Sequence, residues 1–455
     1  MRDRRDRLKG RTVIVAGAGL AGLTAAVELK KAGSKVIVVE ARARIGGRVW
    51  TLRDGFEAGQ HAEAGGDLIE EGQDAVLDLA RRLGLEPVRV LREGFGFARP
   101  GAGGRSITIV RPEAEPWAPL ASRLEPWLRA YRISEQRWDS AIAGHLAGFS
   151  VADWLEQVHA DQQLRVLAAS LRGFFLADPA DLSLLALVDQ FASGMPGRYK
   201  MYRIKGGNDQ LATGLAARLD ERIQLQTELV AVTQTKDAVR ATVRSGRTET
   251  QITADYLVVA LPATTLRSVT FDPPLPPNQA KAIATLTYGR AAKALLQFDR
   301  RFWRRGRRPR AYGTPLPIGA VWDSSEEQRG RSGILTLLAG GTAGEAMHHL
   351  LVQKGADGLA QALGWLGARG VRVRALRLVD WSDDPWVQGG YAYWERGCDP
   401  MLRDWLARHH GRVVFAGEHT SIESQGYMNG AVESGQRAAA EIQALAAGSK
   451  PTKRK

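Results

Sequence analysis

A single lysine interrupts an otherwise small and apolar stretch, "YGRAAKALLQF", at residues 288–298. Lys293 is flanked there by alanines and leucines, which is typical of a largely buried strand. Lysine is rarely fully buried, because its ammonium group loses hydration in an apolar environment. The same loss lowers the pKa of the ammonium, so a buried lysine can supply a proton or a charge at a reaction centre. The alternative is an edge-strand lysine that points to solvent.

Three glycines near the N-terminus are spaced for phosphate binding. Gly17, Gly19 and Gly22 form a G-x-G-x-x-G pattern in "GAGLAG", with Leu20 and Ala21 between the last two. The first glycine of this pattern permits a tight turn, the second lets a pyrophosphate approach the backbone, and the third lets helix and strand pack closely. The helix N-terminus adds unpaired N–H groups that can bind the phosphates.

The elements that this motif needs appear in the required order. "TVIVA" at residues 12–16 predicts a buried parallel strand, and "LTAAVELKKAG" at residues 23–33 predicts an amphipathic helix that Gly33 closes. A second strand, "KVIVVE", ends in Glu40, whose carboxylate can accept hydrogen bonds from a ribose diol. The sequence therefore predicts a dinucleotide-binding unit.

The residues after this unit resemble a known family. Together with Glu40 they read "EARARIGGRVW", which resembles the second fingerprint of the flavin amine oxidase family, Glu-Ala-x-x-x-x-Gly-Gly-Arg. In that family the tract runs along the pyrophosphate of FAD, so the resemblance implies FAD contacts at Ala41, Arg42, Gly47 and Arg48. The residue types agree, because glycines allow close approach and an arginine fork offsets phosphate charge. A basic surface turn is the alternative.

The resemblance recurs at separated points as far as residue 442 and covers nearly the whole chain. "EAGGDLIEEGQDAVLDLARRLGL" is similar to the segment that passes the flavin, and "RIKGGNDQLATGLAARL" to the return into the FAD domain. "RVVFAGEHTSIESQGYMNGAVESGQRAAAEI" resembles the family's last FAD segment, where helix N–H groups face the flavin. The further FAD contacts that the resemblance implies are Gly65, Gly66, Asp67, Val230, Trp381, Gly417, Glu418, Gly426, Tyr427 and Met428.

The resemblance also implies three catalytic residues. Tyr391 in "DPWVQGGYAYW" and Tyr427 in "SQGYMNG" match positions where the family places aromatic side chains on either side of the substrate nitrogen. Parallel rings can guide a neutral amine and orient its C–H bond toward flavin N5. Lys293 matches the family lysine that hydrogen-bonds to flavin N5 through a water. Ordinary core aromatics are the alternative for the tyrosines.

The implied reaction removes a hydride from a carbon that bears an uncharged amine, and O2 reoxidises the flavin with release of hydrogen peroxide. Covalent monoamine oxidases carry a cysteine just before the tyrosine of this segment, where this chain has Gly390. The one cysteine, Cys398, lies further along, so we expect non-covalent FAD. No H-E-x-x-H motif occurs, and no metal is expected.

The sequence favours an L-amino acid as substrate, because its segments look most like those of bacterial L-amino-acid oxidases. The products would be the 2-oxo acid, ammonia and hydrogen peroxide, and the expected substrate contacts are Asp67, Tyr391 and Tyr427. The chain lacks the arginine that snake-venom-type enzymes place shortly after the Gly-Gly-Arg turn to bind the substrate carboxylate. Asp67, Glu70 and Glu71 could face a cationic substrate end or form a solvated helix start. A monoamine or polyamine oxidase is therefore the alternative.

The charge of the chain limits the classes of partner that the sequence predicts. The chain of 455 residues carries a net charge of +14, and its densest basic cluster is "RRFWRRGRRPR" at residues 300–310. Such a cluster can bind phosphates, which leaves a flavin-dependent demethylase or a nucleic-acid-associated flavoprotein as a more remote alternative. No nucleic-acid-binding signature accompanies it, so we interpret it as a solvated loop that Phe302 and Trp303 anchor to the core. The basic chain ends predict disordered tails.

The expected setting follows from the same features. No secretory signal or membrane span is visible, which favours a soluble cytoplasmic protein. The expected partners are a small amine or amino acid and O2, with neither nucleic acid nor membrane, and we expect a homodimer.

The expected fold class is α/β. It combines a Rossmann-like FAD-binding domain, built from discontinuous segments, with an α+β substrate domain that has a helical part between residues 113 and 200. "IQLQTELVAVTQTKDAVRATV" predicts an antiparallel meander, and "ADYLVVALPATTL" a buried central strand. The expected segments are 1–76, 202–280 and 386–448 for FAD binding, 77–201 and 281–385 for the substrate domain, and 449–455 for a basic tail.

Overall fold

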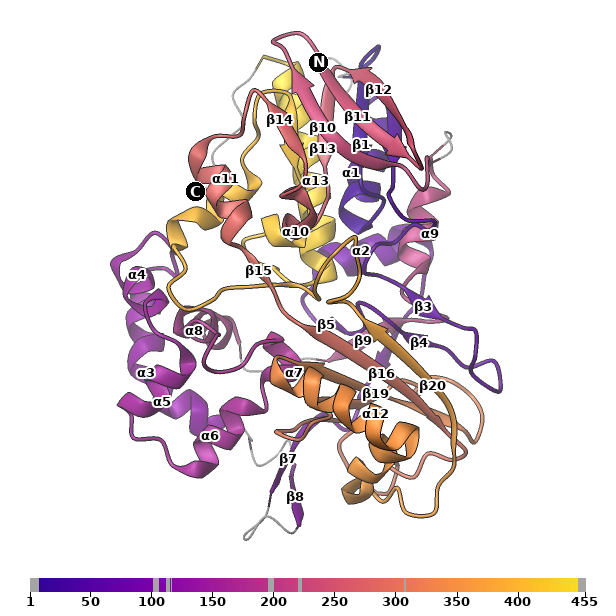
Figure 1. The fold of residues 1–455 in the computed structure, drawn as a ribbon, viewed down its shortest axis with the longest axis vertical. Helices are drawn as coiled ribbons and strands as arrows, with labels where there is room; N and C mark the ends of the chain where they lie inside the picture. The colour runs from indigo at the N-terminus through magenta and orange to yellow at the C-terminus, as the bar shows by residue number, and fades with distance from the viewer. Residues whose placement is uncertain are drawn as a thin grey trace.

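The computed structural model has a mixed α/β fold with two sheets at opposite ends of the molecule (Figure 1). It describes residues 8–100, 106–111, 115, 117–194, 200–219, 223–306 and 308–448. The tails predicted at the two ends of the chain lie outside the described residues. Within the described part, no helix combines the length and apolarity that crossing a membrane would require.

The first sheet is parallel, and its strands come from three distant parts of the chain. Their order is β2 (Lys35–Val39), β1 (Thr12–Ala16), β13 (Tyr256–Val259) and β22 (Val413–Phe415). The strands are almost continuously apolar because both faces are covered. One face packs against α1 (Leu20–Lys31) and α13 (Met428–Ala446), which lie beside the sheet in Figure 1.

The other face of this sheet packs against an antiparallel meander. Its strands are β10 (Glu228–Gln234), β11 (Val239–Ser245) and β12 (Thr248–Ala254), with β14 (Thr270–Asp272) parallel to β10. Apolar residues of both layers form one buried cluster. The predicted meander and the predicted central strand at "YLVV" are therefore confirmed.

Helix α1 differs from its prediction. We expected an amphipathic helix, but nearly every residue from Leu20 to Leu29 is buried. The reason is non-local, because α13 and α9 (Gln210–Ala216) both contact α1. The contact with α13 is close: a Cβ on Gly435 would lie 2.3 Å from the carbonyl oxygen of Ala21. The local pattern could not indicate a partner about 400 positions away.

Among the described residues, the second sheet has seven strands. Their order is β20 (Val373–Asp380), β16 (Ala291–Phe298), β19 (Gly333–Gly340), β18 (Ala320–Asp323), β17 (Ala311–Gly313), β7 (Phe95–Pro100) and β8 (Ile107–Val110). Helix α12 (Thr342–Ala362) lies across β16 and β19 in Figure 1. Strand β16 pairs with β19 on one side and β20 on the other. Lys293 is therefore not on an edge strand, and that alternative is wrong.

The expected helical part is confirmed between residues 118 and 193. It consists of α3 (Ala118–Ile133), α4 (Ala141–Ala147), α5 (Val151–Gln157), α6 (Gln162–Ala169), α7 (Arg172–Phe175) and α8 (Leu184–Ser193). Side-chain caps define several of these short helices. Ser150, for example, begins α5 with a capping box in which its hydroxyl and the Asp153 carboxylate each bind a backbone N–H.

Shorter elements connect these layers. The helices among them are α2 (Asp74–Leu83), α10 (Ala263–Leu266), α11 (Pro277–Thr285), η3 (Gly364–Leu366), η4 (Pro400–Ala407) and η5 (Glu418–Thr420). The strands are β5 (Ile69–Glu70), β6 (Pro87–Val90) and β9 (Met201–Ile204), the pair β3 (Thr51–Leu52) and β4 (Ala62–Glu63), and the pair β15 (Thr287–Tyr288) and β21 (Ala392–Tyr393).

The basic loop after β16 is anchored as the sequence predicted. Phe302 and Trp303 are buried in the core beneath the second sheet. The indole N–H of Trp303 and the guanidinium of Arg304 both donate to the Asp323 carboxylate, at 2.8 and 2.7 Å. Arg301 donates to backbone carbonyls of the neighbouring loop. These basic residues therefore help to hold their own loop.

Candidate active site

A cavity of about 1,260 Å³ lies between the first and second sheets, and residues of the helical part and of α13 also line it. Its lining includes the residues that the sequence singled out, except Gly22 and Val230. Those that line it are Gly17, Gly19, Leu20, Ala21, Glu40, Ala41, Arg42, Gly47, Arg48, Gly65, Gly66, Asp67, Lys293, Trp381, Tyr391, Gly417, Glu418, Gly426, Tyr427 and Met428. Val230 lies at a bulge of β10, and its neighbours Thr227, Glu228 and Leu229 line the cavity instead.

The three glycines of the turn after β1 differ in what a Cβ at each position would contact. Gly17 has a φ of +102°, and a Cβ there would lie 2.7 Å from the carbonyl oxygen of Ala260. A Cβ on Gly22 would lie 1.9 Å from the carbonyl oxygen of Gly17, so Gly22 is required for packing. A Cβ on Gly19 would meet no atom within 4 Å. Gly19 therefore leaves open space at the N-terminus of α1, where a phosphate group fits.

Glu40 joins this turn to the one after β2. Its carboxylate accepts hydrogen bonds from the backbone N–H of Ala18 at 2.7 Å and of Arg42 at 2.9 Å. Burial raises the pKa of Glu40 despite these hydrogen bonds. The guanidinium of Arg42 forms a forked ion pair with Asp384, so its charge is balanced within the protein.

A second ion pair crosses the cavity wall. Arg48 donates to the Glu418 carboxylate at 2.8 Å and to the carbonyl oxygen of Gly390 at 2.9 Å. The other carboxylate oxygen of Glu418 accepts the N–H of Gly426 at 2.7 Å. Burial alone would lower the pKa of Arg48, but the charge of Glu418 raises it above its ordinary value. Arg48 thus connects the second fingerprint to the segment around Gly390 and to the segment that begins at Glu418.

Lys293 is 4% exposed and lines the cavity. Its Nζ donates to the carbonyl oxygens of Glu63 and Gly65, each at 2.8 Å, and lies 3.7 Å from a carboxylate oxygen of Asp67. Burial lowers the pKa of Lys293, and the nearby Asp67 charge opposes that shift. The lysine is thus held by backbone acceptors at the surface of the cavity.

Asp67 is committed to protein partners. One carboxylate oxygen accepts from Nε of Arg203, and the other accepts the indole N–H of Trp322 at 2.7 Å. Burial disfavours its charge, but Arg203 and Lys293 hold the pKa of Asp67 below its ordinary value. Sequence reasoning missed Arg203, although it interrupts the buried strand β9 much as Lys293 interrupts β16.

A further buried acid, Glu63, was also missed. Its carboxylate accepts the backbone N–H of Asn208 at 3.0 Å and the hydroxyl of Thr51 at 2.9 Å. Burial, together with the nearby charge of Asp67, raises the pKa of Glu63. The acids and bases around Lys293 therefore form one buried ionisable cluster.

The two tyrosines line adjacent parts of the cavity. A Cβ on Gly426 would lie 3.4 Å from the ring of Tyr391, so that ring lies against the backbone just before Tyr427. The Tyr391 hydroxyl donates to the carbonyl oxygen of Phe174, and burial raises the pKa of Tyr391. Tyr427 immediately precedes α13. Tyr391 is thus a neutral phenol near neutral pH.

The three acids after Gly66 have different environments. Asp67 is buried in the cluster above, and Glu71 is exposed and pairs with Lys200 at 2.6 Å. Glu70 lines the cavity, and its carboxylate has no hydrogen bond or ion pair within the described part of the chain. Burial raises the pKa of Glu70 to about 7. Helix α2 begins only at Asp74, so none of the three starts it.

The sequence model of the flavin containing amine oxidoreductase family matches residues 20–443, which is most of the chain. The chain belongs to this family. The resemblance predicted from the motifs is thereby confirmed, and the protein is an oxidoreductase with FAD as its cofactor.

The relatives include enzymes named for different substrates. AofH of Mycobacterium tuberculosis, whose name describes it as a flavin-containing monoamine oxidase, is 31% identical over 95% of this chain and 96% of its own. An L-amino acid dehydrogenase of Synechocystis is 26% identical over 94% of each chain. Among solved structures, cyclohexylamine oxidase from Brevibacterium oxydans IH-35A aligns with a TM-score of 0.84, at 25% identity over 96% of this chain and 99% of its own.

The residues present fit FAD. The space beside Gly19 can take a phosphate, and the cavity continues from there to Lys293. The one cysteine of the chain, Cys398, is not among the lining residues, and burial raises the pKa of its thiol to about 11. The cofactor is therefore bound without a cysteinyl link.

Two glycine variants distinguish the effect of filling the open space on FAD binding from the effect of disturbing the packing contact on stability. Gly19→Ala keeps an ordinary backbone conformation, with φ −76° and ψ 179°, so the apo-protein should melt like wild type. Its methyl group enters the phosphate space, so FAD affinity should fall on the order of 10-fold or more. Gly22→Ala, whose Cβ meets the Gly17 carbonyl, should lower the apo-protein stability itself by about 1–3 kcal/mol.

Thermal melts of the apo-proteins and titration with FAD, followed by quenching of flavin fluorescence, measure the two effects. Gly144→Ala in α4 is the control, because a Cβ there also meets open space but lies away from the cavity. Wild-type FAD affinity in Gly19→Ala would contradict the assignment of this space to the phosphates.

Proposed function

We propose that the protein is a FAD-dependent oxidase of L-amino acids. The overall reaction converts an L-amino acid, O2 and water into the 2-oxo acid, ammonia and hydrogen peroxide. The observation that carries this proposal is the convergence of the glycine turn, Lys293, Tyr391 and Tyr427 on one cavity. FAD, when bound, supplies the acceptor for the hydride of the substrate Cα–H bond.

The cofactor would extend across the parallel sheet. The Gly19 space and the N-terminus of α1 would hold the pyrophosphate, Glu40 the ribose, and the backbone around Val230 the adenine. The parallel sheet would form a Rossmann-like domain from residues 1–76, 202–280 and 386–448. Residues 77–201 and 281–385 would form the substrate domain.

The tyrosines would form two walls of the substrate position. Because the Tyr391 phenol is neutral and already donates to Phe174, it orients the substrate amine by contact with its ring rather than by removing a proton. The substrate would therefore react as the uncharged amine. Gly390 lies just before Tyr391, and its carbonyl oxygen accepts from Arg48, which fixes this part of the wall.

Lys293 would place a positive charge and a proton donor beside the flavin ring. Its two carbonyl acceptors hold Nζ in place, and Asp67 favours the protonated form. Such a charge stabilises the negative charge that develops on O2 as it accepts electrons. This role concerns the oxidative half-reaction only.

Lys293→Met tests that role. The rate constant for reoxidation of the reduced flavin by O2 should fall on the order of 100-fold, whereas anaerobic reduction by substrate should change little. Stopped-flow absorbance of the flavin measures both half-reactions. Lys281→Met, which removes an exposed lysine paired with Asp399, is the control. Unchanged reoxidation in Lys293→Met would exclude the proposed role.

A monoamine or polyamine oxidase is the second candidate, and Glu70 is the observation that favours it. An unpaired carboxylate on the cavity wall can bind the distal ammonium of a diamine. Asp67, by contrast, is already neutralised by Arg203 and Lys293, which argues against its pairing with a substrate cation.

The pH dependence of Glu70→Gln tests this candidate. Burial is the one cause of the raised Glu70 pKa, and the adjacent Glu71 is paired with Lys200. If a diamine such as putrescine binds Glu70, kcat/KM for it should rise with pH through about 7 as Glu70 ionises. Glu70→Gln should remove that rise and leave the substrate's own ionisation. Identical profiles in both proteins would exclude Glu70 as a cation-binding residue.

A further inference from the structure

Arg403 is a buried arginine without a carboxylate partner. It lies in η4, is 7% exposed and lines the cavity. One terminal nitrogen donates to the carbonyl oxygen of Ile422, but the buried Nε has no hydrogen-bond partner. None of the ion pairs among the described residues includes Arg403. A buried cation that no carboxylate pairs with directly is costly, so this environment favours an anionic ligand.

The other arginines of the cavity are already committed. Within the described lining there are three of them: Arg42 pairs with Asp384, Arg48 pairs with Glu418, and Arg267 donates to two backbone carbonyls. Arg403 differs from these three because its buried Nε has no hydrogen-bond partner.

The guanidinium of Arg403 packs on an aromatic ring, and a carboxylate acts on its charge without pairing with it. The guanidinium lies over the ring of Trp138, with Cζ 4.1 Å from the ring centroid. Asp189, which accepts the hydroxyl of Tyr131 at 2.6 Å and the indole N–H of Trp138 at 3.3 Å, lies on the same wall. Burial lowers the pKa of Arg403, and the Asp189 charge opposes that shift.

A second free donor lies on the same side of the cavity. The side-chain oxygen of Gln425 accepts the indole N–H of Trp394 at 2.8 Å, which fixes the orientation of the amide because an indole N–H only donates. The Nε2 group of Gln425 is buried without a hydrogen-bond partner, and Gln425 lines the cavity.

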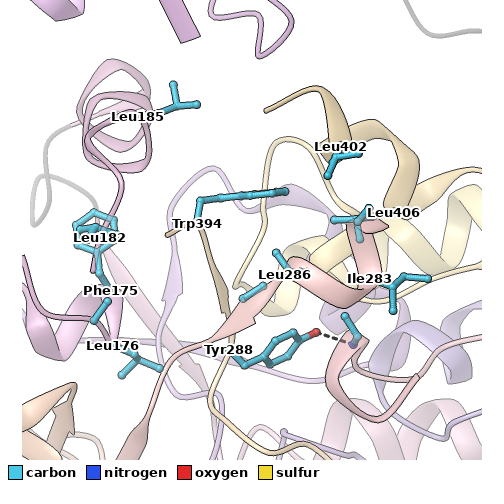
Figure 2. Packing of buried hydrophobic residues seen from close by; sticks show 14 of the residues in the cluster. Phe175, Leu176, Leu182, Leu185, Ile283, Leu286, Tyr288, Trp394, Leu402 and Leu406 are labelled. Atoms are coloured by element: carbon cyan, nitrogen blue, oxygen red, sulfur yellow. Dashed lines mark hydrogen bonds between the residues drawn. The ribbon is translucent and has the colours of Figure 1, made fainter. Parts of the chain in front are cut away.

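A pair of tryptophans connects the two side chains. Trp138 and Trp394 have ring centroids 5.1 Å apart, and they contact Arg403 and Gln425 respectively. Figure 2 shows Trp394 between Leu185 of α8 and Leu402 and Leu406 of η4, which places its ring at the junction of the helical part and η4. The loop that carries Gln425 also supplies the carbonyl of Ile422 that holds Arg403.

We propose that Arg403 and Gln425 bind the carboxylate of the substrate. This inference rests on the proposed function and names the group that distinguishes an amino acid from the amine of the same side chain. Nε of Arg403 donates a charge-assisted hydrogen bond and Nε2 of Gln425 a neutral one, while the two indole rings exclude water and strengthen both. Gln425 is two residues before Tyr427, so the carboxylate binds on the side of the tyrosine pair that faces η4.

The test compares L-amino acids with the amines of the same side chain. L-Phenylalanine with phenethylamine, L-leucine with 3-methylbutylamine, and L-lysine with cadaverine are assayed by peroxide formation and by anaerobic flavin reduction. Wild type should prefer the amino acid of at least one pair. Arg403→Met, which keeps the contact with Trp138, should lower kcat/KM for that amino acid roughly 10- to 100-fold. The paired amine should change by less than about 3-fold.

Gln425→Glu is the sharper variant. The new carboxylate can still accept the Trp394 indole N–H, but it replaces the free donor with an acceptor that repels the substrate carboxylate. It should lower kcat/KM for the amino acid at least as much as Arg403→Met, while the amine is retained. Arg408→Met is the matched control, because Arg408 follows η4, lies over Trp405 and is exposed outside the cavity. It should change neither substrate.

A ligand that cannot be oxidised gives a readout independent of turnover. Phenylacetate should perturb the flavin absorbance of wild type with a Kd about 10-fold or more below that for Arg403→Met, whereas the neutral phenylacetamide should bind both alike. Equal phenylacetate binding, or equal loss of amino acid and amine oxidation in Arg403→Met, overturns the assignment. Oxidation of amines but of no amino acid contradicts both the proposed function and the assignment, and leaves an amine oxidase.

The proposed function fails without deciding the assignment when neither class of substrate is oxidised. In that case the flavin-containing protein reduces its flavin with none of the six probes, and the phenylacetate titration then decides the role of Arg403 by itself.

Discussion

Burial of the Lys293 ammonium in a central strand sets the constraint on which the rest of the site depends. The ammonium loses water on burial, and the segment at residues 63–67 compensates with two carbonyl acceptors and with the charge of Asp67, 3.7 Å from Nζ. This segment must therefore pass directly over strand β16. Removing one partner from a buried charged cluster typically costs about 3–5 kcal/mol, so the crossing is strongly held.

That crossing connects the two ends of the molecule. Arg203 of β9 holds Asp67 from the opposite side, and the carbonyl oxygen of Arg48 accepts the N–H of Gly66 at 2.9 Å. Arg48 in turn pairs with Glu418 beside the last helix. The glycine at position 65 is needed because a Cβ there would lie 1.8 Å from the Arg48 carbonyl oxygen. Backbone packing and ion pairing thus fix the same stretch of cavity wall.

The sequence indicated those parts of the site whose signal is local. A few adjacent residues are enough to recognise each of these signals: the G-x-G-x-x-G turn, the acid at the end of β2 and the lysine in an apolar strand. The meander was also predictable from its alternating pattern, and the helical part from a composition rich in Leu, Ala and Trp. The partners of these residues were not, because the pairing of Asp67 with Arg203 joins positions 136 residues apart. The burial of α1 likewise depends on α13.

The free donors of Arg403 and Gln425 were invisible for the same reason. A buried arginine is recognised as unpaired only when every neighbouring segment is in place, and α8 is far in sequence from η4 and from the loop before Tyr427. In this chain the cofactor region is readable from motifs, whereas the proposed substrate region depends on tertiary contacts.

The most direct measurement of the central claim is a crystal structure of the protein with FAD. The account predicts that the flavin ring lies between Lys293 and the pair Tyr391 and Tyr427, with a water bridging the Lys293 Nζ and flavin N5. It also predicts that Nζ keeps its two carbonyl acceptors. A flavin ring bound elsewhere in the cavity, with Lys293 facing only protein atoms, would contradict it.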